Sequence, residues 1–413
     1  MSFLTREARD EWRAHWPVVA GTGIGMASCY AVFSFVGSLF VQPLQDEFGW
    51  TRGQQALSHN ANLVAAFLAP FIGAYVDKVG VRKVLLPAIL LVVLCYVALA
   101  NLTPSLVHYY VAMSALVLIG IATTGLSFTR AVTSWFDKSR GLALAVSRMG
   151  LTLSGALMPV LLYIAIERYG SRGGFYLLAG VALFISFPVT WALVRDRRPE
   201  PAAVAARSGA VAGWRLWPRL LRNRRILLLC IAAGFTYGPA VGLLSQLQPL
   251  LVSKALDPKV AAGLVSLLAV STFAGTAITG LLIDRVWAPV LGFLFTIGPV
   301  AGCGLLYLLD APGLTVAAAC IVLIGLAQGA EIDLAGFIIA RYFGMQAFAA
   351  IYGLTVLAIG TCAAFGAILV GLVHDWYGSY DIALLAAGVC FLIAALTYPL
   401  LGRYPDKPGI DLG

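Results

Sequence analysis

The chain has 413 residues, of which 60% are hydrophobic and only 11% are charged. Soluble globular domains contain about 45–50% apolar and about 25% charged residues, so this composition excludes a soluble protein and indicates a polytopic membrane protein. The formal net charge of +9 would suit a nucleic-acid partner. The placement of the basic residues, described below, indicates a membrane-insertion signal instead, and we expect no nucleic-acid partner.

Apolar stretches follow one another along the whole chain. A membrane-spanning helix needs about 20 apolar residues, and twelve stretches reach this length: 17–43, 54–76, 83–102, 107–133, 142–166, 174–194, 226–250, 260–283, 288–309, 313–340, 346–373 and 380–401. Charges, glycines or prolines mark the breaks between them. We therefore expect an all-α membrane protein with twelve transmembrane helices.

One break is much longer than the others. Residues 195–225, RDRRPEPAAVAARSGAVAGWRLWPRLLRNRR, contain nine arginines together with prolines and an alanine-rich run. This composition is typical of a loosely ordered linker. It divides the chain into an N-terminal half, residues 1–194, and a C-terminal half, residues 226–413, with six predicted helices each.

The basic residues are distributed unevenly across the predicted membrane. If both termini are cytoplasmic, 21 of the 28 Lys and Arg residues lie on the cytoplasmic side and five lie on the other. The remaining two, Arg130 and Arg148, lie within predicted helices. Cytoplasmic loops carry an excess of Lys and Arg, so the pattern predicts cytoplasmic termini and a cytoplasmic linker, and it accounts for the net charge.

Short sequences recur at an interval near half the chain length. Tyr30 is echoed by Tyr237 at an offset of 207, and four longer matches have offsets of 206 to 208. These pairs are GAYVDKVG at 73 with GLLIDRVW at 280, SWF at 134 with RYF at 341, QPL at 42 with QPL at 248, and YGS at 169 with YGS at 377. A parallel six-helix repeat of this kind is a transporter architecture.

Residues 73–83, GAYVDKVGVRK, resemble the signature loop of the major facilitator superfamily. The positions that match are Gly73, Asp77, Lys78, Gly80, Arg82 and Lys83. The second half keeps Gly280, Asp284 and Arg285. The resemblance covers the whole chain, and it implies two six-helix halves in which helices 1, 4, 7 and 10 line a cavity.

The resemblance implies that this loop is a conformational gate. We expect the gate to consist of Gly73, Asp77, Lys78, Arg82, Gly280, Asp284 and Arg285. Glycine lets two helices approach closely, and a carboxylate can meet the partial positive charge of a helix N-terminus. The alternative is a surface loop whose charges only direct membrane insertion.

A second motif, SWFDKSRGLALAVSRMGLTLSG at 134–155, is similar to the start of the fifth helix in the monocarboxylate and oxalate/formate transporter group. Residues 46–58, DEFGWTRGQQALS, also resemble that group. The group often has charged residues in helices 1, 8 and 11. The corresponding ranges 17–43, 261–283 and 347–373 contain none, so the charged binding residues of the group are not carried over.

Two arginines within the predicted helices are candidates for substrate binding. Intramembrane ionisable residues are costly and indicate function by default. Arg130 continues a polar stripe at helical spacing, formed with Thr123, Ser127 and Ser134, and either Arg130 or Arg148 could hold a carboxylate through two hydrogen bonds. The alternative is that both form structural ion pairs.

Residues 327–344, AQGAEIDLAGFIIARYFG, carry two acids in an apolar helical stretch. Residues two apart point to different sides of a helix, so Glu331 shares a face with Gln328 while Asp333 faces elsewhere. We expect Glu331 to meet the cavity and exchange protons, because a partly desolvated carboxyl group can titrate near neutral pH. Asp333 is a second candidate for coupling or a packing partner, and the alternative is that both acids only neutralise arginines.

Further polar side chains are candidates for contact with a substrate. His59 and Asn62 form a stripe with Gln55 in the second predicted helix, where a plain polar lining is the alternative. Tyr30 and Tyr237 occupy equivalent repeat positions near the centres of helices 1 and 7, and substrates of such folds bind near the midplane. Gln328, on the face of Glu331, completes the set.

These observations predict a secondary active transporter of a small organic anion, a carboxylate, with proton symport. The alternative is an anion exchanger or a drug or metabolite exporter of the same fold. The sequence contains no Gly-x-Ser-x-Gly, no HExxH, no nucleotide-binding loop and no metal-ligand spacing of its seven cysteines, so we expect no enzyme, metal or cofactor. We expect a multi-pass monomer in the lipid bilayer of the plasma (inner) membrane.

Overall fold

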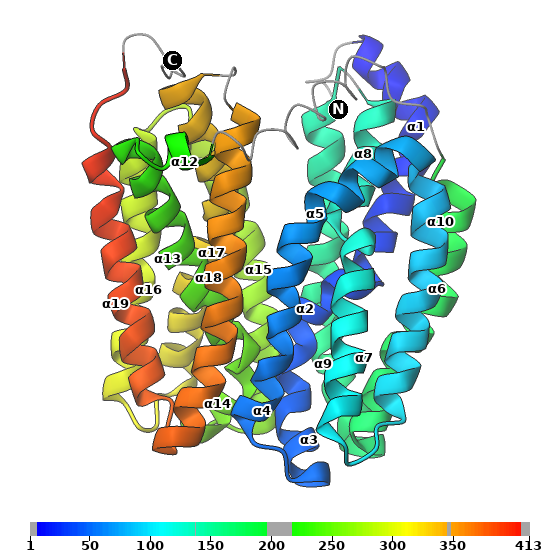
Figure 1. Cartoon of the computed structure of the whole chain (residues 1–413), viewed down its shortest axis with the longest axis vertical. Coiled ribbons are helices and arrows are strands. Elements are labelled where there is room, and N and C mark those ends of the chain that lie inside the picture. Colours follow the sequence, from blue (N-terminus) through cyan, green and yellow to red (C-terminus); the bar gives the residue numbers. More distant parts are fainter. Residues whose placement is uncertain (1–5, 137, 196–216, 345–347, 406–413) are drawn as a thin grey trace. The chain divides into compact units, whose positions relative to one another are not determined.

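The structure is a computed structural model that describes residues 6–136, 138–195, 217–344 and 348–405, without the side chains of Pro70, Ala74, Asp77, Leu126 and Ala349. All secondary structure within these ranges is helical (Figure 1). Nine helices there are long and apolar enough to cross a membrane, or ten if the bent pair Arg6–Ala27 and Tyr30–Phe48 is one span.

The chain forms two compact units. The first contains residues 1–48 and 67–206, and the second contains residues 49–66 and 207–413. The predicted linker lies mostly outside the described residues. The short segment 49–66 precedes most of the first unit in the sequence, yet it groups with the second, and this grouping was not expected.

The first unit begins with a broken helix. α1 (Arg6–Ala27) ends before a bend of 49°, and the chain continues through short helical turns and α2 (Phe33–Val36) to α3 (Val41–Phe48). The other helices of this unit are α6 (Val81–Ala100), α7 (Leu106–Gly120), α8 (Gly125–Trp135), α9 (Arg140–Val181) and α10 (Phe187–Leu193). α1 packs against α8, α9 and α10, and α6 packs against α7 and α9.

Two of the predicted helices in this unit are interrupted or fused. The stretch predicted as one helix over 107–133 breaks between α7 and α8, where the Thr123 and Thr124 hydroxyls bond back to the carbonyls of Gly120 and Ile121. The helical run Arg140–Leu193 is a single candidate membrane span with 54 residues. As a straight helix it would be about 80 Å long. It bends at Gly170, which has a φ of 68°.

The second unit contains the short helices α4 (Arg52–Ala56), α12 (Trp217–Leu220) and α14 (Leu247–Ser253). Its long helices are α13 (Arg224–Ser245), α15 (Pro258–Leu282), α16 (Ala288–Leu308), α17 (Leu314–Phe343), α18 (Phe348–Tyr377) and α19 (Asp381–Thr397). α13 packs along α18, α15 along α17, and α16 along both α17 and α19. α5 (Asn60–Val79) crosses the boundary between the units at residue 66.

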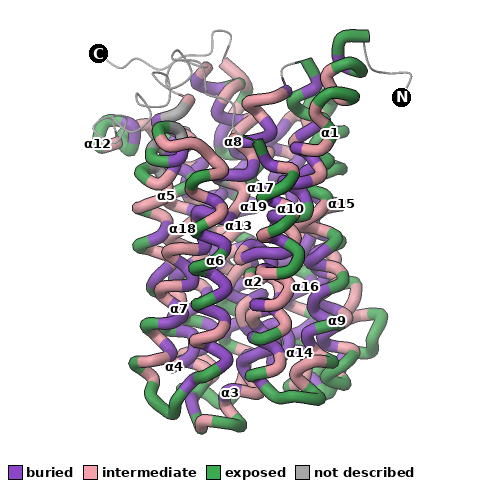
Figure 2. The backbone as a smooth tube through the Cα atoms, turned by 90° about the vertical axis from the view of Figure 1, so that its right-hand side faces the viewer, coloured by how far each residue is buried: buried purple, intermediate pink, exposed green. Residues whose placement is uncertain are grey.

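Helices within each unit approach closely where glycines face a neighbouring backbone. A Cβ at Gly329 of α17 would collide with the Thr272 carbonyl oxygen of α15, and one at Gly366 of α18 would collide with the Gly238 carbonyl of α13. Small residues are the usual means of close packing in membranes, where water does not drive helices together. Exposed residues recur along the lengths of α6 and α7 (Figure 2), and Leu94 and Val111 are among them, as expected for lipid-facing surfaces.

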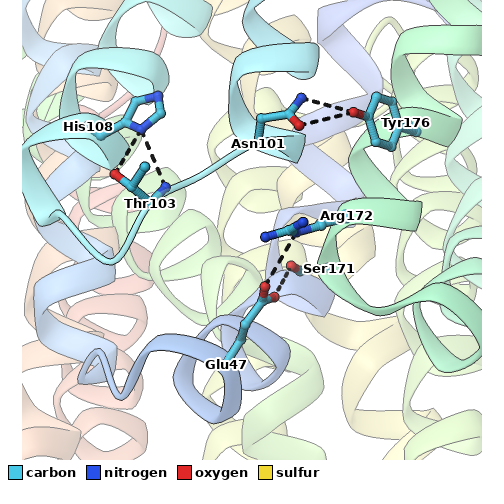
Figure 3. A network of polar contacts seen from close by, with 7 residues as sticks. All are labelled: Glu47, Asn101, Thr103, His108, Ser171, Arg172 and Tyr176. Carbon is cyan, nitrogen blue, oxygen red and sulfur yellow. Dashed lines mark hydrogen bonds and ion pairs between the residues drawn. The ribbon is translucent and has the colours of Figure 1, made fainter.

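The structure gives the repeated motifs equivalent places. The two QPL sequences lie in α3 and α14, and the glycines of the two YGS sequences have φ values of 68° and 69°. In the first unit the Glu47 carboxylate accepts a hydrogen bond from Ser171 and lies 3.7 Å from Arg172 Nε (Figure 3). In the second, Lys254 pairs with Asp381 at 2.9 Å. Glu47 and Lys254 are 207 residues apart, and Arg172 and Asp381 are 209 apart, so the two halves carry ion pairs of reversed charge at nearly equivalent positions.

The close contact at Gly329 leads to a stability prediction. The substitution Gly329→Ala should lower the free energy of unfolding by about 1–3 kcal/mol, the usual cost of overpacking. Gly304→Ala is the matched control, because a Cβ there has no atom within 4 Å, and it should be neutral or stabilising by up to about 1 kcal/mol. Thermal unfolding in detergent measures both, and equal melting temperatures would contradict the packing described here.

Candidate functional site

Glu331 lies at the centre of a buried polar cluster in the second unit. Its residue is 1% exposed, and the Tyr398 hydroxyl lies 2.9 Å from Oε1 and 2.8 Å from Oε2. The Thr236 hydroxyl on α13 also reaches the carboxyl group. Among the residues that the structure describes, no Lys, Arg or His lies within ion-pair distance of Glu331.

The local sequence explains how the acid reaches this place. Gly329 brings α17 against α15, and its carbonyl accepts a hydrogen bond of 2.8 Å from Thr276. Glu331 is two residues further along α17 and so points to another side, toward α13 and the end of α19. Tyr398 follows α19 directly, and its ring packs on Gly292, where a Cβ would lie 2.5 Å from a ring carbon.

Two further candidates join this cluster. The Gln328 side chain lies beside the Tyr237 hydroxyl on α13, and Tyr237 is also close enough to interact with Glu331. Gln328 is 7% exposed, and its Oε1 accepts no hydrogen bond from any described residue. The structure therefore brings Tyr237, Gln328 and Glu331 together, whereas Asp333 is only half-buried.

The candidate pair in segment 49–66 is also formed. Asn62 Nδ2 and His59 Nδ1 lie 3.2 Å apart, and both residues are half-buried. Gln55, which the sequence placed on the same stripe, is buried, and its Nε2 lies 3.4 Å from the Trp50 carbonyl. A helical stripe was predicted here, although α4 and α5 are separated by a tight turn over residues 57–59.

The first unit places its candidates differently. The Tyr30 ring follows the break in the first helix and packs against Gly120. The Arg130 guanidinium on α8 lies over Gly73, where a Cβ would be 2.5 Å from Nη2. Arg148 is exposed on α9. Because α8 begins only at Gly125, Thr123 does not continue the helical stripe of Arg130, and that part of the prediction is wrong.

Comparison with known proteins decides the family. The model of the Major Facilitator Superfamily matches residues 22–360. The chain belongs to the Major Facilitator Superfamily. Members of this superfamily are transporters rather than enzymes, so the protein is a multi-pass membrane transporter.

Individual relatives within the superfamily are distant. Monocarboxylate transporter 13 of Rattus norvegicus is 27% identical over 92% of this chain and 86% of its own. The agnestins efflux protein of Paecilomyces divaricatus is 26% identical over 84% and 78%. A solved nucleoside transporter superposes with a TM-score of 0.78 at 12% identity, covering 94% of this chain and 100% of that one, and it shows the shared fold.

The superfamily signature loop can now be placed on the structure. Gly73 is buried under Arg130, so it makes room for a guanidinium where close approach of a helix was expected. Gly280 has open space around it, so the close approach predicted there is wrong. The reason is that Gly280 lies near the end of α15, beyond its contact with α17 at Gly275.

The charged residues of the two signature loops are mostly at the surface. Arg82 lies 5.8 Å from the Trp191 ring centre, while Lys78, Asp284 and Arg285 are exposed. The Asp77 side chain falls outside the described residues. The gating role of these residues stays a prediction.

Sequence reasoning did not find Tyr398 and Thr236. Both lie in apolar stretches more than 60 residues from Glu331, and a hydroxyl group in such a stretch is usually bonded to its own helix backbone. Thr236 does bond to the Ala232 carbonyl at 2.8 Å. The sequence held only a weak signal for Tyr398. A buried acid needs hydrogen-bond donors, and the last predicted helix contains few side chains that can donate.

The contact between Gly73 and Arg130 allows the two repeat glycines to be compared directly. Gly73→Ala should displace the guanidinium and slow transport severalfold with little loss of stability, because the crowded atoms belong to the far end of a flexible side chain. Gly280→Ala should leave transport unchanged. Initial uptake rates at matched expression measure the difference. Equal rates in the two variants would show that transport does not depend on the position of the Arg130 guanidinium over Gly73.

Proposed function

We propose that the protein is a proton-coupled symporter of a small organic anion, a carboxylate, and that Glu331 carries the coupled proton. The observation that supports this most is the burial of Glu331 beside hydroxyl groups, with no cation at ion-pair distance among the described residues. A structural ion pair, the alternative for this acid, would need a cation beside it. The proposal leaves Asp333 a secondary role in packing.

The chemistry of the cluster suits a group that gains and loses a proton. A buried carboxylate without a neighbouring cation is costly, and binding a proton removes that cost. Hydroxyl groups both donate and accept hydrogen bonds. Tyr398 donates to the ionised acid, and Thr236, whose own proton goes to the Ala232 carbonyl, can accept a hydrogen bond from the protonated acid. An arginine or lysine could serve only the ionised form.

The carboxylate substrate is supported by the relative whose name states monocarboxylate transport. Arg130 and Arg148 supply the positive charge that such a substrate needs, and an arginine can hold a carboxylate through two parallel hydrogen bonds. Tyr237 and Gln328 lie beside Glu331 and place polar groups next to the proposed proton site. Tyr30, His59 and Asn62 stay candidates for contact.

We further propose twelve spans with cytoplasmic termini, organised as halves 1–194 and 226–413 joined by the basic linker. The bend at Gly170 allows the run Arg140–Leu193 to cross twice. A monomer in the plasma (inner) membrane that works by alternating access completes this proposal.

An exporter is the second candidate, supported by the resemblance to the agnestins efflux protein. The two functions differ in the direction in which a proton gradient drives the substrate. An inward proton gradient across proteoliposomes accumulates the substrate of a symporter and depletes the substrate of a proton-driven exporter from the lumen.

The coupling role of Glu331 is tested by Glu331→Gln, which keeps the shape of the side chain and removes its titration. We expect this variant to lose pH-driven accumulation, at least tenfold, while retaining counterflow exchange without a gradient. Asp333→Asn is the matched control, and it should keep accumulation at a lower expression level. Full pH-driven accumulation by Glu331→Gln would assign the acid to structure alone.

The proposed topology is tested by labelling cysteines in intact cells with an impermeant reagent. Arg207→Cys, in the basic linker, should react only after lysis, because the excess of Lys and Arg in cytoplasmic loops predicts that the linker, with its nine arginines, is inside. Asp310→Cys, in the exposed turn between α16 and α17, should react in intact cells. The opposite labelling pattern would invert the topology.

A further inference from the structure

The basic surface 217–224 consists of α12 and the turn that leads from it into α13 (Figure 1). α13 is a candidate membrane span of 22 residues, which makes it about 33 Å long. The hydrocarbon core of a bilayer is about 30 Å thick. When α13 spans the bilayer, its first turn therefore lies where the hydrocarbon meets the lipid headgroups, and residues 217–223 lie at the level of those headgroups.

Contacts within the second unit hold the backbone of the basic surface in place. Trp217 Nε1 donates a hydrogen bond of 3.2 Å to the Ala350 carbonyl of α18, and Leu220 is 1% exposed in the apolar core of the unit. The Asn223 side chain accepts a hydrogen bond of 3.0 Å from the Arg225 amide and so caps α13. The side chains between these points are displayed on a fixed backbone, so binding a partner costs little ordering.

Three side chains of the basic surface are exposed arginines, namely Arg219, Arg222 and Arg224. None of the three forms an ion pair or a side-chain hydrogen bond with another residue that the structure describes. Their neighbour Arg225 is engaged, because its guanidinium lies 5.5 Å from the Tyr342 ring centre. The sequence from 201 to 256 contains no Asp or Glu, so the nearby chain supplies no acid for the three exposed charges.

Exposed leucines lie among these arginines. Leu221 and Leu227 are each 43% exposed, and they flank Arg222 and Arg224 in the sequence. Arginine can keep its charged group in the headgroup layer while its stem lies along apolar surface, and leucine fits the acyl chains below. Basic and apolar side chains in this arrangement suit a lipid better than a free anion, which would make no use of the leucines.

The corresponding region of the first unit is neutralised by the protein itself. The repeat interval of 207 residues relates the basic surface to residues 10–17 of α1. Beside that region Lys138 Nζ lies 3.3 Å from Glu7, and Arg13 lies 3.9 Å from Asp10. The Glu11 carboxylate accepts a hydrogen bond of 2.7 Å from the Ser139 hydroxyl. The unpaired arginines are therefore a feature of one half, which a general excess of basic residues does not explain.

We propose that Arg219, Arg222 and Arg224 form a binding surface for anionic phospholipids such as phosphatidylglycerol. The guanidinium groups contact the headgroup phosphates, and Leu221 and Leu227 contact the acyl chains. An arginine can hold a phosphate through two parallel hydrogen bonds, and an anionic lipid layer attracts basic residues at its surface. This binding is independent of the proposed transport function, because it involves none of the candidate substrate or proton residues.

Lipid enrichment at the basic surface can be measured without a substrate. Leu221→Cys carries a bimane fluorophore in nanodiscs of phosphatidylcholine that contain a small fraction of nitroxide-labelled lipid. Labelled phosphatidylglycerol should be enriched over labelled phosphatidylcholine by at least about fivefold, the effect of one arginine at an anionic surface. Leu281→Cys is the control position, because Leu281 is 72% exposed near the end of the next span, α15. The two lipids should quench a fluorophore there equally, and equal quenching at position 221 would overturn the proposal.

Substitution of the arginines tests which charges attract the lipid. Arg219→Gln/Arg222→Gln/Arg224→Gln should abolish the enrichment, and lysine at the same three positions should keep it, because lysine retains the charge. Arg6→Gln/Arg9→Gln/Arg13→Gln removes the same charge from exposed positions of α1 and should leave the enrichment unchanged. Enrichment that survives the first set of substitutions, or that the α1 set removes equally, would overturn the proposal. Loss of enrichment in inorganic phosphate, but not in chloride of equal ionic strength, would assign the surface to free phosphate instead.

Discussion

A polar group inside a lipid bilayer must find its hydrogen-bond partners within the protein, because the hydrocarbon offers none. This constraint governs the second unit around Glu331. The acid is satisfied only if α17 lies close enough to its neighbours for Tyr398 and Thr236 to reach it. Glycines allow this packing: Gly292 makes room for the Tyr398 ring, and Gly329 lets the opposite side of α17 lie against α15. The position of the chemical group therefore depends on the smallest side chains near it.

The sequence predicted an all-helical membrane protein correctly because hydropathy and length largely determine membrane helices, whereas the structure describes nine or ten of the twelve predicted spans as candidates. It could not predict the breaks with the same certainty. Thr123 and Thr124 end α7 by bonding to their own backbone, and the same residues are compatible with a continuous helix. The signature glycines show a similar limit, since Gly73 and Gly280 match the same motif but only Gly73 is crowded. Which of two equivalent glycines is needed depends on tertiary neighbours.

Helical spacing predicted which site residues of the same helix share a face, but not which residues of other helices they contact. The helical period placed Gln328 and Glu331 on one face and separated Asp333, and the repeat singled out Tyr237, which meets Gln328. The partners Tyr398 and Thr236 come from other helices, so no spacing in the sequence connects them to Glu331. The same holds for Tyr380, whose hydroxyl accepts a hydrogen bond from Arg52, 328 residues away in the chain.

The repeat preserves interactions more faithfully than residues. Glu47 with Arg172 and Lys254 with Asp381 form ion pairs of reversed charge at nearly equivalent positions, so a search for identical residues misses this similarity. The repeat between the two halves does not extend to Glu331. Glu331 lies within the continuous α17, whereas its counterpart Thr124, 207 residues earlier, lies at the break between α7 and α8. The scaffold is duplicated, and the proposed coupling group is not.

α19 connects two buried tyrosines that make polar contacts in the second unit. Tyr380 precedes its first residue and Tyr398 follows its last, and the helix between them has 17 residues, a length of about 26 Å. One tyrosine holds segment 49–66 and the other holds Glu331. A helix without internal breaks transmits a displacement from one end to the other, so a change at the Tyr380 contacts and a change at the acid can influence each other through α19. Substitutions at the two tyrosines should therefore act non-additively, which is the physical signature of coupling between sites.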